Sequence, residues 1–347
     1  MRKQEDRCID SVIVLTVICT LSVLLLHHAN YTLDFLSPAR PFHLHKLLQR
    51  FAVGGFIFLS GFKLTKSKLK SSISEFVINR FSKIYGLYFL SVIIFSTTAY
   101  PYLNNENFPS IKNTLLHLVA LQAILPDHFG NNFHTLWFVS VLLICYSAFL
   151  IFRAWLTDLS KFILWVSGFT LSISIIRIIF LQRGIYLFQY DLELWLLIFF
   201  AGMINADRNL SLEIKEYYLI FAKFAIIFGL SILLFLYNYS GDIPANIFRI
   251  IEIFGALIFL FPSYSLILRK HFIFHPYVIF ILKYIAASSY CIFLLHRSIW
   301  TVLFYLFSDR TIVQSLFILG LGVPLICLIS YLFQSSYTSL TKINTKR

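Results

Sequence analysis

The sequence predicts an all-α integral membrane protein of about ten transmembrane helices, with residues 1–347 forming one domain. Hydrophobic residues make up 59% of the 347 residues and charged residues only 13%, which is too little polar surface for a water-soluble protein of this size. Long apolar runs recur along the chain, close to the roughly 20 residues that cross a hydrocarbon core about 30 Å thick. The net charge of +13 is concentrated in short connecting segments, as expected for a multi-pass membrane protein.

The apolar runs define the predicted membrane spans. We expect helices near 12–29, 51–64, 84–99, 136–155, 162–181, 192–206, 217–237, 247–268, 283–307 and 313–333. The second run is short, and we expect the helix to extend into its flanks. The first run is too long for a signal peptide and no small-residue cleavage site follows it, so we expect it to be retained.

Basic residues fix the predicted orientation. The N-terminus, the 63–83 segment, the Arg269–Lys270 connection and the C-terminal tail are basic, whereas the loop 238–246 has no basic residue. The positive-inside rule therefore predicts that both termini are cytoplasmic.

The apolar segment 111–126 is the exception among the runs. The predicted orientation puts both of its ends on the outer side, so it cannot cross the membrane. We expect an interfacial or re-entrant helix between the third and fourth spans.

Several function classes are excluded. The positive charge follows from membrane topology, and no basic and aromatic interleaving on a soluble face indicates nucleic-acid binding. The five cysteines show no paired spacing and four lie in apolar runs, so we interpret them as packing residues. No phosphate-cradling GxxxxGK[ST], serine-hydrolase GxSxG or zinc-binding HExxH motif occurs, and we expect no metal site.

Two adjacent histidines, His27 and His28, end the first span on the predicted outer side. Imidazole titrates near neutral pH and can act as a general base toward a sugar hydroxyl. Alternatively, these histidines only cap the helix or face lipid headgroups. His134 before the fourth span and His296 in the ninth are expected at the same outer level.

A basic cluster lies at the cytoplasmic start of the third span. Arg80 and Lys83 are three residues apart and share one helical face. With Lys66, Lys68 and Lys70 they could bind the phosphates of a cytosolic coenzyme. Positive-inside topology and anionic lipid would explain the same residues.

Charged residues inside predicted spans are Arg177, Arg249 and Glu252. Each is costly against lipid, so we expect a partner or an inward-facing function. Alternatively, Arg249 and Glu252 neutralise each other. Arg177 would then reach the membrane surface with its long side chain. The glycines of 53–62 are expected to allow close helix packing, with a substrate passage as the alternative.

A histidine ends the first span, and the second, third, fourth and ninth spans contain the segments FAVGGFIFLSGF, RFSKIYGLY, LWFVSVLLICY and SSYCIFLLH. In this order, these motifs resemble the acyltransferase-3 family of bacterial membrane O-acyltransferases over most of the chain. The resemblance implies about ten spans and cytoplasmic termini.

The resemblance also implies an activity. Members transfer an acyl group, usually acetyl from acetyl-CoA, to a hydroxyl of a surface glycan, which here would be a lipid-linked or nascent O-antigen, capsule or exopolysaccharide at the bacterial inner membrane. The family's catalytic first-span histidine matches His27 or His28. Its basic residues for coenzyme binding match Arg80 and Lys83, and its ninth-span histidine matches His296.

The chain departs from the family pattern at one position. Members usually carry an arginine eleven residues before the first-span histidine, where this chain has Thr16 or Val17. Arg177 is a candidate substitute, and Glu252 a further accessory residue. The alternative functions are a polysaccharide polymerase or a lipid-linked glycan flippase. The external loops are short for a polymerase, the predicted spans are few for a flippase, and no inverted repeat suggests a transporter.

Overall fold

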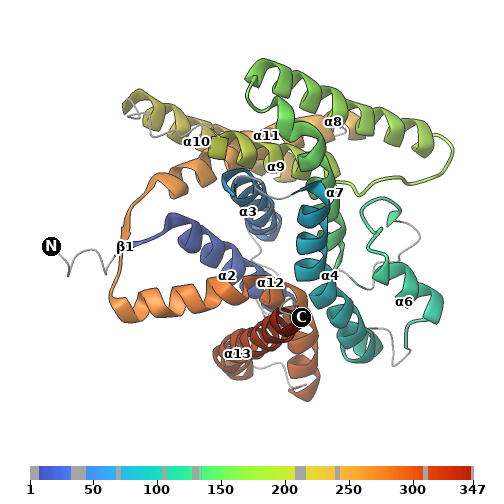
Figure 1. Cartoon of the computed structure of the whole chain (residues 1–347), viewed down its shortest axis with the longest axis vertical. Coiled ribbons are helices and arrows are strands. Elements are labelled where there is room, and N and C mark those ends of the chain that lie inside the picture. The colour runs from blue at the N-terminus through green and yellow to red at the C-terminus, as the bar shows by residue number, and fades with distance from the viewer. Residues whose placement is uncertain are drawn as a thin grey trace.

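The computed structural model describes residues 8–32, 44–67, 72–103, 108–126, 133, 135–207, 216–238, 243–307 and 312–344. Within these residues the chain is almost entirely helical (Figure 1). The long helices are α2 (Ser11–Thr32), α3 (Leu44–Lys66), α4 (Ile73–Thr97), α7 (Trp137–Phe152), α8 (Leu159–Leu181), α9 (Leu192–Asp207), α10 (Glu216–Asn238), α11 (Ala245–Arg269), α12 (Pro276–Leu306) and α13 (Ile312–Asn344). The short ones are α5 (Ala99–Leu103), α6 (Ile111–Leu118) and the 3₁₀ turn Arg153–Trp155.

The ten predicted spans coincide with the ten long helices, which confirms the all-α prediction. In the described part of the chain, eight helices are long and apolar enough to cross a membrane. The apolar stretches Ser11–Leu25 of α2 and Leu192–Ala206 of α9 are shorter. The second predicted span extends on both sides to become α3, as expected. The number of spans and the side of the termini stay predictions.

The segment 111–126 does not form a spanning helix. Its helix α6 has only 8 residues, about 12 Å of rise, and Ala120 follows with a φ of 57°. The backbone N–H groups of Phe188 and Gln189 then donate to the carbonyls of Ile124 and Ala123, both at 2.8 Å. The segment therefore folds against the α8–α9 connection, in agreement with the predicted interfacial or re-entrant element.

A two-residue strand pair joins the first helix to a distant part of the chain. Strand β1 (Cys8–Ile9) pairs antiparallel with β2 (Phe272–Ile273), with Cys8 opposite Ile273. Because α2 follows β1 and α12 follows β2, the two helices begin at the same place and run side by side in the same direction (Figure 1).

Helix α3 lies near the middle of the bundle, between α2 and α9 (Figure 1). Two glycines allow the contact with α9. A Cβ on Gly61 would lie 2.2 Å from the carbonyl oxygen of Phe199, and one on Gly202 would lie 2.1 Å from that of Phe58. No side chain fits at these distances, which confirms the predicted packing function of the glycines and fixes α3 against its neighbour.

Candidate functional site

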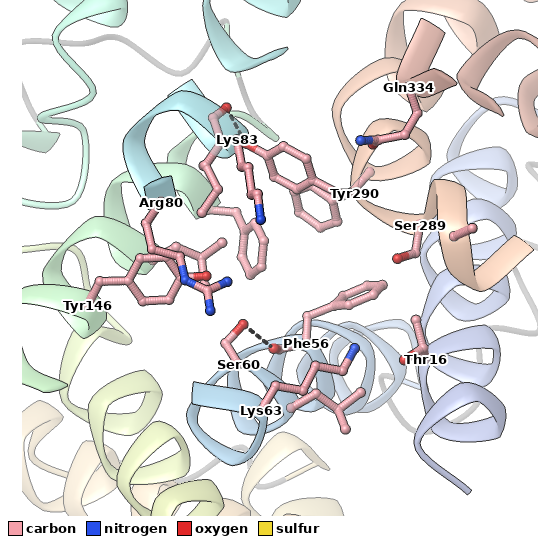
Figure 2. Close-up of a pocket in the computed structure, with 16 residues that line it drawn as sticks. Thr16, Phe56, Ser60, Lys63, Arg80, Lys83, Tyr146, Ser289, Tyr290 and Gln334 are labelled. Carbon is pink, nitrogen blue, oxygen red and sulfur yellow. Dashed lines mark hydrogen bonds between the residues drawn. The ribbon is translucent and has the colours of Figure 1, made fainter. Parts of the chain in front are cut away.

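A cavity of about 280 Å³ lies between α2, α3, α4, α7, α12 and α13 (Figure 2). Three cationic side chains, Lys63, Arg80 and Lys83, line it, and no carboxylate from the described part of the chain does. None of the three has an ion-pair partner among the described residues. This site, called the cationic cavity below, therefore attracts an anionic ligand.

Helix α3 supplies one wall of the cavity. Phe56, Leu59, Ser60 and Lys63 all line it, and their i, i+3, i+4, i+7 spacing puts them on one helical face. The side chain of Lys63 is exposed, and the space that it faces is this cavity. Asp10, just before α2, acts on Lys63 electrostatically from beyond ion-pair distance.

Helix α4 brings Arg80 and Lys83 to the same cavity, as their spacing predicts. The guanidinium carbon of Arg80 lies 5.7 Å from the ring centroid of Phe76, and the guanidinium group lies beside Tyr146 of α7 (Figure 2). The ammonium group of Lys83 points into the cavity (Figure 2). A rigid aromatic surface thus orients the planar cation, which suits recognition of phosphate.

Hydrogen bonds fasten α4 to the helices across the cavity. The hydroxyl of Tyr290 on α12 donates to the carbonyl of Ile84 at 3.0 Å, and that of Tyr337 on α13 donates to the carbonyl of Ser82. A Cβ on Gly86 would lie 2.0 Å from the Tyr337 hydroxyl. The missing side chain of this glycine therefore makes room for the tyrosine that holds α13 against the cavity.

Three phenylalanines from three helices form one wall of the cavity: Phe56, Phe138 and Phe293. Their ring centroids lie 4.4 to 6.2 Å apart, with the closest approach between Phe138 and Phe293. We call this cluster the aromatic wall. His296 lies next to it, with its ring centroid 5.9 Å from that of Phe293.

His296 does not line the cavity. It is fully buried in α12, and its Nδ1 donates to the carbonyls of Ile292 at 3.0 Å and Phe293 at 2.8 Å. Since a carbonyl oxygen only accepts, Nδ1 carries the hydrogen of the neutral ring and Nε2 is then the basic nitrogen.

The predicted first-span histidines lie in the last turns of α2, but their side chains, like all of His134, lie outside the described residues. Helix α2 runs beside α12 in the same direction, and Leu24 of α2 belongs to the same buried cluster as Ile292 of α12.

Of the three predicted coenzyme-binding residues that the structure describes, Arg80 and Lys83 line the cavity and Lys66 does not. Lys66 is exposed, with its ammonium group 4.8 Å from the ring centroid of Phe62, and Lys68 and Lys70 lie outside the described residues. Lys63 was missed as a site residue, although its spacing from Phe56 and Ser60 would have shown that it shares their face.

Thr16, at one of the two positions where the resembling family usually has arginine, also lines the cavity. Its hydroxyl is used within α2, donating to the carbonyl of Val12 at 2.7 Å. Threonine is uncharged, so this position adds no cation to the cavity. The cations of the cavity come from α3 and α4.

A second group of charges lies at the other end of α3, and its charges are paired. Arg50 contacts Asp191 at 3.1 Å and Glu252 at 3.0 Å, and it donates to the hydroxyl of Tyr237 at 2.6 Å. Arg50 and Glu252 are buried. These contacts join α3 to α10, α11 and the residue before α9.

Arg177 and Arg249 complete this group by sharing Glu193 of α9. Arg177 contacts the Glu193 carboxylate at 2.9 Å, and Arg249 contacts it as well. The predicted Arg249–Glu252 pairing is wrong, because each residue meets an opposite charge from another helix. The outward extension of Arg177 is also wrong, since its side chain is buried with Glu193. We call Arg50, Arg177, Asp191, Glu193, Arg249 and Glu252 the paired-charge network.

The cysteines behave as predicted in the described residues. Cys19, Cys145, Cys291 and Cys327 are free and buried. Cys19 lies against Gly55, where a Cβ would come within 2.3 Å of its sulfur, so it serves the packing of α2 on α3.

The fold and the cavity define a multi-pass membrane protein that can hold an anionic ligand inside its helix bundle. The chain belongs to the acyltransferase-3 family, since the family model described as an acyltransferase domain matches residues 9–333. The protein is therefore a membrane acyltransferase, which confirms the resemblance. No curated protein and no solved structure matches the chain.

Proposed function

We propose that this protein is an O-acetyltransferase of the bacterial cytoplasmic membrane. It takes the acetyl group of cytoplasmic acetyl-CoA and transfers it to a hydroxyl of a lipid-linked or nascent surface polysaccharide, such as O-antigen, capsule or exopolysaccharide. The observation that carries the proposal is the cationic cavity, which Lys63, Arg80 and Lys83 line together and to which the residues that the structure describes add no carboxylate.

Coenzyme A fits this charge pattern. Its pyrophosphate and ribose phosphate are anions of the kind that arginine and lysine bind. Arg80 and Lys83 lie in the first part of α4, in the basic region that the positive-inside rule assigns to the cytoplasm. In the proposed complex the phosphates contact these cations and the thioester arm extends along α3 toward the aromatic wall.

The aromatic wall supports a short acyl group. Phe56, Phe138 and Phe293 pack against each other and line the cavity. In the proposed complex a short acyl group lies against these bulky rings. Acetyl is therefore the donor group that we propose.

The proposed reaction uses a first-span histidine, His27 or His28, as general base. The acceptor hydroxyl attacks the thioester carbonyl while the imidazole takes its proton. The carbon–sulfur bond then breaks, and the thiolate of coenzyme A leaves and takes up a proton. A positioned base contributes roughly 10²- to 10⁴-fold, so loss of the correct histidine should nearly abolish turnover.

An NMR spectrum of the surface polysaccharide tests the activity directly. It compares cells carrying the intact gene, a deletion, and the deletion complemented with wild type, His27→Ala or His28→Ala. We expect the O-acetyl signal to disappear on deletion and to return with wild type but not with one histidine variant. Unchanged acetylation with altered chain length or amount would instead support a polymerase or flippase.

A matched pair of lysines on α3 tests the donor site. Lys63 lines the cavity, whereas Lys66 lies one turn further on and does not. We expect Lys63→Gln to weaken acetyl-CoA binding and Lys66→Gln to leave it unchanged, as measured by titration of the purified protein in detergent. Equal effects of the two variants would contradict the assignment of the donor site.

A further inference from the structure

Neutral polar side chains from the described residues also line the cationic cavity: Thr16, Ser60, Tyr146, Ser289, Tyr290 and Gln334. Several of them are already used within the protein. The hydroxyls of Thr16, Ser60 and Tyr290 donate to backbone carbonyls at 2.7 to 3.0 Å, and Tyr146 shares a hydrogen bond with Ser60. The hydroxyl of Ser289 on α12 and the amide of Gln334 on α13 point into the cavity (Figure 2), so these two groups are the ones to examine for a ligand.

The amide of Gln334 is oriented by a buried cysteine. The thiol of Cys291 on α12 donates to Oε1 of Gln334, with the sulfur and the oxygen 3.0 Å apart, and Cys291 is fully buried. Because the oxygen is held by α12, the two N–H groups of Nε2 are left to donate elsewhere. Within the described part of the chain Nε2 has no hydrogen-bond partner, so Gln334 presents an oriented donor to the cavity.

Ser289 differs from its neighbour Ser288. The Ser288 side chain is fully buried, and its hydroxyl donates to the carbonyl of Tyr284 at 3.0 Å. Ser289 lines the cavity instead, and its hydroxyl makes no hydrogen bond to the residues that the structure describes. Phe293 follows Ser289 by four residues and so lies on the same face of α12. Ser289 therefore lies one helical turn from the aromatic wall, with a hydroxyl that can both donate and accept.

We propose that Gln334 and Ser289 bind an amide group in the pantetheine arm of coenzyme A, an inference that rests on the proposed function. A secondary amide has one acceptor and one donor. In the proposed complex Nε2 of Gln334 donates to the amide oxygen, and the Ser289 hydroxyl accepts from the amide N–H.

The arm is favoured over the nucleotide because of where the two side chains lie. The phosphates are drawn to the cations of α3 and α4, whereas Ser289 and Gln334 are uncharged and belong to α12 and α13. Ser289 also adjoins the aromatic wall, where the proposed acyl group lies. The arm joins the phosphates to the acyl group, so its amides are the polar groups that pass between the cations and the wall.

Calorimetric titration of the purified full-length protein in detergent tests the proposal with two ligands. Acetyl-CoA carries the arm, whereas adenosine 3′,5′-bisphosphate keeps the nucleotide and phosphates but lacks it. Gln334→Met keeps the length of the side chain and removes both N–H groups, and Ser289→Ala removes the hydroxyl. Loss of one neutral hydrogen bond weakens affinity roughly 2- to 10-fold. We expect each variant to weaken acetyl-CoA binding by this factor and to leave binding of the bisphosphate unchanged.

Ser288→Ala is the matched control, because it removes the neighbouring hydroxyl that α12 itself uses. It should leave both affinities unchanged, and circular dichroism establishes that each variant is folded. An equal loss of affinity for the bisphosphate would place Gln334 and Ser289 at the nucleotide and overturn the proposal, as would an unchanged affinity for acetyl-CoA in the double variant. If wild type bound neither compound, the proposed donor site itself would be wrong, and this inference with it.

Discussion

Helix α3 carries a cation near each end, and the two have opposite surroundings. Arg50 contacts the carboxylates of Asp191 and Glu252, whereas Lys63, thirteen residues and about 20 Å further along, has no carboxylate in contact among the described residues and shares its cavity with Arg80 and Lys83. The paired-charge network has three arginines and three carboxylates. Counting described residues, the cationic cavity has three cations and no carboxylate.

This difference distinguishes charges that hold the helices together from charges that can bind a ligand. A buried arginine with two carboxylates is satisfied within the protein, and its contribution is to hold helices together. Three neighbouring cations repel one another and destabilise the fold until an anion joins them. The same residue type thus indicates structure at one end of α3 and binding at the other, and only its partners distinguish the two.

The largest expected effect comes from breaking the paired-charge network. Arg50→Gln leaves Asp191 and Glu252 without their shared cation, and breaking a buried pair in this way costs about 3–5 kcal/mol. We expect a clearly lower melting temperature in detergent. The double variant Arg50→Gln with Glu252→Gln should recover part of the loss, and an unchanged melting temperature in the single variant would contradict the structural function of the network.

The same substitution in the cavity should act differently. Arg80→Gln removes a hydrogen-bonding charge worth about 1.5–3 kcal/mol to a bound anion, so we expect the KM for acetyl-CoA to rise roughly 10- to 100-fold. The melting temperature should stay constant or rise, because repulsion with Lys63 and Lys83 is relieved. A loss of stability as large as that of Arg50→Gln would show that Arg80 is structural.

A smaller effect is expected at the aromatic wall. Phe293→Leu shortens the side chain beside the proposed acyl site, and each added methylene that becomes buried is worth about 0.8 kcal/mol. We expect the preference for acetyl-CoA over butyryl-CoA to fall about tenfold, measured as transfer of labelled acyl groups to glycan in membrane vesicles. Phe162→Leu, a buried position of α8 packed on Phe200, should leave this preference unchanged.

The smallest effect is a pH dependence outside both regions. The backbone N–H of Lys161 donates to the Asp158 carboxylate at 3.2 Å, which lowers the pKa of Asp158 below the usual value of about 3.9. The folded state therefore gains stability from this cap above that value and loses it as the pH falls through the lowered pKa. Below pH 4 the melting temperature should therefore fall with falling pH in wild type, and it should fall less in Asp158→Asn.

The helices and the face of α4 that carries Arg80 and Lys83 could be predicted from the sequence, because hydrophobic length and helical spacing are local properties. Lys63 was assigned only to topology, since a lysine at the end of a span is normally explained by the positive-inside rule. Lys63 follows Phe56 by seven residues and Ser60 by three, and this spacing would have placed it on their helical face.

The paired-charge network could not be predicted in the same way. Its contacts join residues as distant in sequence as Arg50 and Glu252, and helix rotation decides which charges meet. Arg249 and Glu252 have the spacing of a local pair, yet each contacts another helix. Local spacing therefore does not predict which charges pair where three or more helices contribute charge at one depth.

The glycine contact between α3 and α9 has a consequence for the mobility of these two helices. With the carbonyl oxygens of Phe199 and Phe58 where side chains at Gly61 and Gly202 would be, these helices meet backbone to backbone and cannot slide past each other without collision. Helix α3 is therefore held in one position against α9. Helix α4, by contrast, meets α12 and α13 through side chains, the hydroxyls of Tyr290 and Tyr337.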